Sequence, residues 1–199
     1  MDKITEYWEK EIRGNWFKDH KATLTKQGDL MVIDWRKSGT CIFGVRYVFD
    51  GRFLYVTGDI GEAVFKFSEK GYLVSQDYDL GYFMEKMTAC SRPRYQFDSD
   101  VALKELDDRI NIAKEEHDYE NEDDDYEPYP KDAVKELREI IAECSTVESF
   151  QHEINQLDLY QFGNEFYEWL PELGSTISGE VRAYLIGLKM ASEQLSKVS

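Results

Sequence analysis

Two groups of carboxylates are the residues with which this chain could do chemistry. The first is the turn Gly58-Asp59-Ile60-Gly61-Glu62, where two acidic side chains lie three residues apart. Together with Asp34 or Asp50, Asp59 and Glu62 can supply oxygen ligands for Mg²⁺, as in metal-dependent nucleases and phosphatases. The structural alternative is that an aspartate between glycines accepts hydrogen bonds from its own backbone. Both interpretations stay open at this point.

The second group is the acidic run Glu115–Glu127, in which nine of thirteen residues are Asp or Glu and none is Lys or Arg. A run of like charge is most often a solvated loop, but it also steers a cationic surface toward the chain. We therefore expect either a solvated loop or a docking surface for a basic partner. The candidate partner-binding residues are Glu115, Glu116, Asp118, Tyr119, Glu120, Glu122, Asp123, Asp124, Asp125, Tyr126 and Glu127.

Other kinds of site find no support in the spacing of residues. An EF-hand loop starting at Asp118 would need glycine at its sixth and glutamate at its twelfth position, where the chain has Asp123 and Tyr129. The three histidines are scattered, and the chain has no phosphate-binding loop, nucleophile elbow or dinucleotide motif. The sequence therefore predicts no cofactor and no catalytic residue outside the Asp59 and Glu62 alternative.

The net charge of −16 is concentrated in the middle of the chain. Residues 98–148 hold 19 acidic and 6 basic residues, whereas residues 1–97 hold 14 and 15. The first half has Lys and Arg among its aromatic residues, but a pI near 4.6 opposes attraction to phosphates. We expect no direct binding to nucleic acid. A basic protein is the expected partner, and the oligomeric state is left open.

The first half reads as a β-sheet preceded by a short amphipathic helix over 3–12. Hairpins are predicted around Gln27-Gly28-Asp29 and at Asp50-Gly51, the second with a type I′ turn. At least four or five strands then form an antiparallel meander. From Tyr78 the apolar residues recur at helical spacing until Arg92-Pro93, which predicts a helix against the sheet.

The second half reads as helices. Ser99 can cap the first of them, Pro130 can begin the next, Ser145–Glu148 fits a capping box, and Ser178 can cap the last. The fold class is therefore α+β, with a β-rich lobe over 1–97 and a helical lobe over 98–199 that contains the acidic loop at 115–130. No stretch reaches the ~20 apolar residues needed to cross a bilayer. The start lacks the apolar core of a signal peptide, and the widely spaced Cys41, Cys90 and Cys144 are expected to be reduced core residues of a cytoplasmic protein.

One segment resembles known proteins. Arg46–Phe67, with the pattern DGRFLYVTGDIGEAVF, is similar to small proteins carried by bacteriophages and mobile elements of Gram-positive bacteria. In size and acidity the chain also resembles anti-CRISPR inhibitors. This resemblance implies an acidic inhibitor in the host cytoplasm that mimics nucleic acid and occupies a basic surface of an RNA-guided CRISPR nuclease. It assigns no individual contact or catalytic residue.

Overall fold

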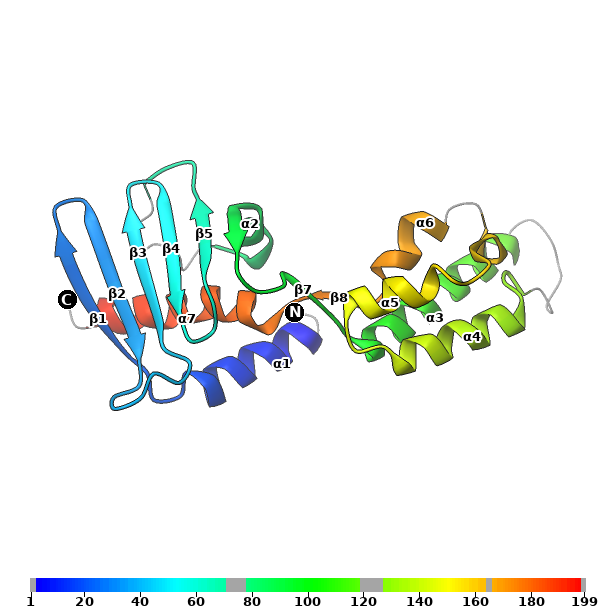
Figure 1. Ribbon diagram of the computed structural model, residues 1–199, viewed down its shortest axis with the longest axis horizontal. Helices are drawn as coiled ribbons and strands as arrows, with labels where there is room; N and C mark the ends of the chain where they lie inside the picture. The colour runs from blue at the N-terminus through cyan, green and yellow to red at the C-terminus, as the bar shows by residue number, and fades with distance from the viewer. Residues whose placement is uncertain (1–2, 71–77, 119–126, 164–165, 198–199) are drawn as a thin grey trace. The chain divides into compact units, whose positions relative to one another are not determined.

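The computed structural model describes residues 3–70, 78–118, 127–163 and 166–197. They belong to two compact units (Figure 1). Unit 1 comprises Met1–Arg94 and Ser178–Ser199, and unit 2 comprises Tyr95–Ile177. The α+β class with an antiparallel sheet in the N-terminal half is confirmed. The division differs from the predicted lobes 1–97 and 98–199 because the last helix packs on the sheet and so belongs to unit 1.

Unit 1 is built on a six-stranded antiparallel sheet whose strands follow one another in chain order. Each neighbouring pair is joined without a crossover, as expected for a meander. The strands are β1 (Lys21–Gln27), β2 (Leu30–Arg36), β3 (Val45–Asp50), β4 (Phe53–Gly58), β5 (Ala63–Lys66) and β6 (Met87–Cys90).

Helices cover one face of this sheet (Figure 1). They are α1 (Lys3–Glu11), the π-helical turn η1 (Ile12–Trp16), α2 (Leu80–Glu85) and α7 (Gly179–Ser196). Alternate residues of β2 and β3, among them Ile33, Trp35 and Tyr47, are buried on the covered face, in keeping with the two-residue period of a strand. Ser178 caps α7 by accepting a hydrogen bond from Val181 N at 3.4 Å, which confirms the predicted cap.

Tyr47 ties the sheet to α7. Its hydroxyl is fully buried and donates a 3.0 Å hydrogen bond to the carbonyl O of Tyr184. Burial raises the pKa of Tyr47 well above its ordinary value, so the phenol keeps the proton that it donates.

We expect Tyr47→Phe to destabilise unit 1 by about 1 kcal/mol, because a buried hydrogen bond is lost while the ring still fills its place. Native-state hydrogen exchange of the β3 and α7 amides measures this loss. Unchanged protection in these two elements would show that the hydroxyl contributes nothing to stability.

Both predicted hairpins form, but the turn geometry of the second is not the one expected. The pair Asp50↔Phe53 places Gly51 and Arg52 at the centre of the turn. Gly51 has φ +58°, whereas Arg52 does not have positive φ. Positive φ at the first central position alone is the pattern of a type II′ turn, so the type I′ prediction is wrong.

The predicted helix from Tyr78 to Arg92-Pro93 is also wrong in its length. The helix α2 ends at Glu85, and Met87–Cys90 form β6 instead. The N-cap of α2 is Asp79, whose carboxylate accepts a hydrogen bond from Tyr82 N at 2.7 Å. The helical period ended early because β6 pairs with β5 and completes the sheet, and this tertiary pairing outweighs local spacing.

Unit 2 is a set of helices closed at one end by a two-stranded ladder. An apolar core that includes Leu106, Leu137, Phe150 and Leu170 holds its elements together. The elements are β7 (Tyr95–Phe97), α3 (Ser99–Asp118), α4 (Lys131–Glu143), α5 (Val147–Ile154), η3 (Leu159–Phe162), α6 (Phe166–Trp169), η4 (Leu170–Glu172) and β8 (Ser175–Ile177).

Two helix starts in unit 2 differ by one residue from the predicted caps. Asp98, rather than Ser99, accepts from the backbone of the first turn of α3, with Val101 N at 3.1 Å from its carboxylate. At α5 the cap is Thr146, and Ser149 completes the reciprocal pair of a capping box. Both residues carry the short side-chain oxygen that an N-cap requires.

Two further expectations concern the burial of the cysteines and the presence of a helix that could span a membrane. Cys41, Cys90 and Cys144 are all free, as predicted, but none is fully buried. Cys41 is exposed, Cys90 is half-buried, and Cys144 is half-buried against the core of unit 2. No helix among the described residues combines the length and the apolar composition that crossing a bilayer requires.

A buried histidine makes the stability of unit 1 depend on pH. His20 lies between Phe17 and Trp35, and its Nε2 donates to the carbonyl O of Phe43 at 3.2 Å. Its Nδ1 is buried without a partner. Desolvation lowers the pKa of His20 below the ordinary 6.5, an effect that nearby Lys37 reinforces and Asp19 opposes.

Because the unfolded chain binds this proton more readily, unit 1 has its full stability above pH 6.5 and loses part of it as the pH falls below that value. We expect His20→Asn to flatten the change in melting temperature between pH 7 and pH 5. The pKa values of Asp19 and Asp34 are also lowered, but these two groups change the stability only at more acidic pH, below their ordinary pKa of 3.8. If the melting temperature of the variant falls between pH 7 and pH 5 as much as that of the unchanged chain, His20 is not the cause of the pH dependence.

Candidate acidic interface

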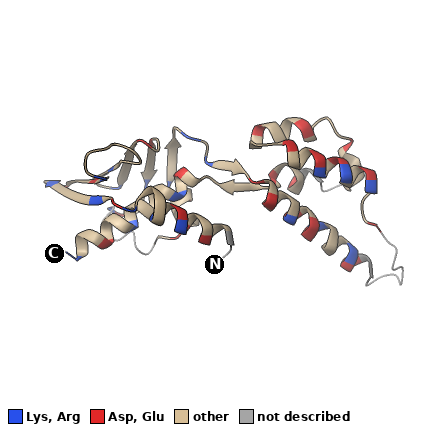
Figure 2. Cartoon of the chain, turned by 90° about the horizontal axis from the view of Figure 1, so that it is seen from below, with Lys and Arg blue, Asp and Glu red and all other residues tan. Residues whose placement is uncertain are grey.

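Charge is divided unequally between the two units. Unit 2 contains 24 Asp and Glu against 6 Lys and Arg, a net charge of −18, while unit 1 contains 16 against 18, a net charge of +2. Figure 2 shows acidic residues along the helices of unit 2, with few basic residues among them. The acidity of the chain is therefore a property of unit 2 and extends well beyond the run at 115–127.

The structure describes part of the predicted acidic run. Glu115 and Glu116 are exposed near the end of α3, and Asp118 is the last residue of that helix. Glu127 pairs with Lys114 Nζ at 3.2 Å and with Lys131 Nζ at 3.7 Å, so its charge is partly compensated. The remaining predicted contacts lie outside the described residues: Tyr119, Glu120, Glu122, Asp123, Asp124, Asp125 and Tyr126.

Tyr129, which follows the acidic run, packs against the core of unit 2. The ring is half-buried, with its centroid 5.7 Å from that of Phe162 and 6.3 Å from that of Trp169. A shallow hollow of about 310 Å³ beside it is lined by three cations, Lys131, Lys135 and Arg138, against the single carboxylate of Glu127. This flank of unit 2 is therefore less suited to a basic partner than the run predicts.

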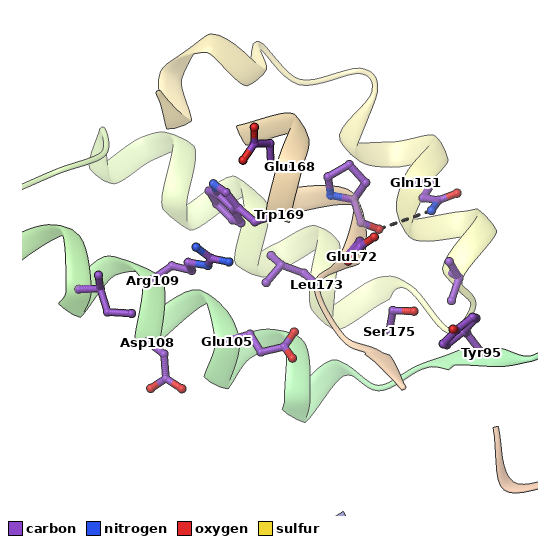
Figure 3. A pocket seen from close by; sticks show the side chains of 13 residues that line it. Tyr95, Glu105, Asp108, Arg109, Gln151, Glu168, Trp169, Glu172, Leu173 and Ser175 are labelled. Atoms are coloured by element: carbon purple, nitrogen blue, oxygen red, sulfur yellow. Dashed lines mark hydrogen bonds between the residues drawn. The ribbon is translucent and has the colours of Figure 1, made fainter. Parts of the chain in front are cut away.

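A second hollow of unit 2, the α3–α5 groove, has a volume of about 840 Å³. It is bordered by α3 and α5 and floored by the segment from Trp169 to Ser175 (Figure 3). Its lining residues are Tyr95, Glu105, Asp108, Arg109, Ile112, Val147, Gln151, Glu168, Trp169, Pro171, Glu172, Leu173 and Ser175. All of them belong to unit 2.

The α3 wall follows from helical spacing. Glu105, Asp108, Arg109 and Ile112 are separated by three, one and three residues and so share one side of the helix. Figure 3 shows Arg109 reaching from α3 toward Trp169, and its guanidinium carbon lies 5.8 Å from the centre of that ring. The single cation of the lining is thus held against the face of an indole.

The floor is fixed by hydrogen bonds between its backbone and side chains of α3 and α5. Gly174 N donates to Glu105 Oε2 at 2.9 Å, and Gln151 Nε2 donates to the carbonyl O of Pro171 at 3.5 Å (Figure 3). Gly174 has φ +68°, and a Cβ there would lie 2.7 Å from the Cβ of Ala102. Only glycine fits this contact without displacing α3.

The groove combines an apolar floor with a negative rim. Ile112 and Tyr95 are each 50% exposed, although both are large apolar side chains, and Leu173 forms part of the floor. The lining has four carboxylates against one guanidinium. Among the described residues no Lys or Arg pairs with Asp108, Glu168 or Glu172, whereas the neighbouring Asp107 on α3 pairs with Arg138. Such a surface suits a ligand that is both apolar and cationic.

The Asp59 carboxylate of the turn at 58–62 accepts a hydrogen bond from the backbone. Asp59 Oδ2 accepts from Phe43 N at 2.8 Å, and Asp59 N donates to the carbonyl O of Gly44 at 2.9 Å. Glu62 N donates to Ser91 Oγ at 2.8 Å. In the described part of the chain no three His, Cys, Asp or Glu side chains gather as metal ligands do. The Asp59 side chain therefore ties the turn to the backbone of Phe43, 16 residues earlier, and not to the turn's own backbone as the structural alternative expected.

Asp34 lies in a different cluster from Asp59. Arg46 Nε donates to its Oδ1 at 2.8 Å, and Arg36 pairs with the same carboxylate. The hydrogen bond from Arg46, with the help of Arg36, lowers the pKa of Asp34. The side chain is committed to a surface ion-pair network on the sheet.

Comparison with models of protein families, with curated proteins and with solved structures found no match to this chain.

Proposed function

We propose that the chain is a protein-binding inhibitor whose acidic unit 2 occupies a basic, nucleic-acid-handling surface of its partner. The observation that carries this proposal is the segregation of charge, with −18 on unit 2 and +2 on unit 1. A net charge of this size in 83 residues destabilises the compact state by self-repulsion. A cationic partner would relieve that repulsion, because its Lys and Arg side chains pair with the carboxylates in place of nucleic-acid phosphates.

An RNA-guided CRISPR nuclease is the partner that we propose. Such an enzyme holds its guide–target duplex in a positively charged channel, which recognises backbone charge rather than sequence. A polyanionic surface competes for that channel without imitating any base. The similarity of Arg46–Phe67 to proteins of bacteriophages supports the same choice.

Competition for the channel provides the test. A labelled target DNA is bound to the guide-loaded nuclease, and its fluorescence anisotropy is followed as the full chain is added. We expect the chain to displace the DNA at low salt and to do so less well at 0.3 M salt, because screening weakens exposed charge pairs. Target DNA that stays bound at saturating concentrations of the chain would reject the proposed partner.

The contribution of the acidic run can be measured in the same assay. Changing Asp123, Asp124 and Asp125 to Asn is expected to weaken binding on the order of tenfold at low salt and to flatten its dependence on salt. The matched control changes Glu6, Glu69 and Glu85, which are exposed in unit 1, to Gln. Equal losses in the two triple variants would mean that net charge, and not the run, sets the affinity.

A further inference from the structure

We infer that the α3–α5 groove receives an amphipathic helix of the partner, one that carries leucine-like residues on its inner side and Lys or Arg along its flanks. The inference rests on the proposed function and identifies the part of unit 2 that makes the contact. The acidic run was the interface predicted from sequence, so the groove is a different site on the same unit.

The apolar part of the groove calls for an apolar partner. Ile112 is half exposed, whereas Ala102 and Leu106 of the same helix are buried. Tyr95, in β7, is equally exposed. Ile112 and Tyr95 line the same groove as Leu173 and Trp169. Leu173 and Trp169 are already buried, so the gain comes from the exposed surface of Ile112 and Tyr95. Burying that surface contributes about 25 cal/mol per Å², a gain that a purely hydrophilic polycation cannot supply.

The exposed carboxylates of the groove favour a partner with cations at the edges of its contact surface. Asp108, Glu168 and Glu172 are exposed and without a Lys or Arg partner among the described residues. Arg109 is placed over Trp169 and points across the groove (Figure 3). In contrast, Glu127 at the end of the acidic run is already paired with two lysines. Uncompensated carboxylates and exposed apolar surface thus coincide at the groove.

The walls favour a helix over an extended peptide. From Glu105 to Ile112 the α3 wall spans about 10 Å, or two helical turns, and α5 supplies the opposite wall with Val147 and Gln151. These walls present side chains, whereas an extended peptide is held chiefly by the backbone groups of a strand edge. A helix fills a trough between two helices by placing residues at i, i+3, i+4 and i+7 along it.

The probe for this test is a fluorescein-labelled 18-residue amphipathic helix of leucine and lysine, compared with a scrambled peptide of the same composition. Both are titrated with the full chain at 50 mM and 300 mM salt. The groove variant changes Asp108→Asn, Glu168→Gln and Glu172→Gln. Its control changes Asp132→Asn, Glu136→Gln and Glu143→Gln, which are exposed on α4 outside the groove. A second pair compares Ile112→Ser with Ile42→Ser, an isoleucine that is 61% exposed in unit 1.

We expect the amphipathic helix to bind more tightly than the scrambled peptide. The groove variant should bind it about tenfold more weakly and the α4 control less than about twofold. Ile112→Ser should cost about fivefold and Ile42→Ser nothing. If both triple variants weaken binding equally and Ile112→Ser has no effect, the groove inference fails while an acidic unit 2 that binds cations stands. If neither peptide binds at 50 mM salt, the proposed function itself fails.

Discussion

Replacing Gly174 by alanine is expected to destabilise unit 2 by about 3 kcal/mol, since it combines two costs at one position. The backbone there has φ +68°, a conformation that L side chains rarely adopt. The new Cβ would also lie 2.7 Å from the Cβ of Ala102 and from the carbonyl O of Asp98. Relieving these contacts moves the floor of the groove away from α3, and the hydrogen bond from Gly174 N to Glu105 is lost.

Hydrogen exchange of the α3, α4 and α5 amides measures this effect within unit 2. The control is Gly163→Ala, because Gly163 has φ +84° but no atom within 4 Å of a Cβ. It should cost about 2 kcal/mol, from conformational strain alone, because φ +84° with ψ 178° is a region that almost only glycine adopts. The Gly174 variant should also bind the amphipathic probe more weakly than the Gly163 variant does. Equal protection in the two variants would contradict the close approach that the groove floor requires.

Gly58→Ala is expected to be the most damaging single change in unit 1, with a loss of about 4 kcal/mol. A Cβ at this position would lie 2.1 Å from the carbonyl O of Gly44, and this backbone oxygen cannot move aside cheaply. Gly58 pairs with Val45 at the end of the β3–β4 ladder, and the same carbonyl O of Gly44 accepts from Asp59 N. The substitution therefore separates the two central strands where the turn at 58–62 begins.

Gly51→Ala separates steric overlap from backbone strain. Gly51 has φ +58° in the β3–β4 turn, but nothing lies within 4 Å of a Cβ there. We expect a loss of about 1 kcal/mol for Gly51→Ala, and reduced expression of folded protein for Gly58→Ala. The melting temperatures of the two variants compare them directly. A Gly58 variant as stable as the Gly51 variant would show that the strands separate without cost.

The hairpins were predictable from sequence because their signals are local. Glycine between two runs of β-branched and aromatic residues places a turn whatever the rest of the chain does, and the turns at Gly28 and Gly51 formed there. The fate of Met87 was not predictable in this way. It continues the helical spacing of Phe83, yet it lies in β6, where it pairs with Phe65 of β5, a strand more than 20 residues earlier that local spacing cannot reveal.

The groove was beyond sequence reasoning for a different reason. Its walls come from α3 and α5 and its floor from the segment Trp169 to Ser175. The contact that fixes it joins Gly174 to Glu105, 69 residues away. The one local signal was Ile112, an isoleucine among charged neighbours on α3. Its place on the polar side of the helix indicated an exposed apolar residue, but the partner elements that turn it into the wall of a groove are set by tertiary packing.

The position of the acidic region was the best-predicted feature of the candidate site, but its extent was underestimated. The run at 115–127 marked the acidic region, yet 15 of the 24 carboxylates of unit 2 lie outside it. Most of those that the structure describes lie on the helices of the unit. Single residues of this kind form no run in the sequence and become one surface only when the helices pack together.

The most direct measurement is a ¹H–¹⁵N correlation spectrum of the full chain titrated with the leucine–lysine helix at 50 mM salt. We predict shifted amides in 105–112, 147–151 and 168–175, with the resonances of the β-sheet unchanged. Shifts confined to the sheet strands, or an unchanged spectrum at saturating peptide, would contradict the assignment of cation binding to unit 2.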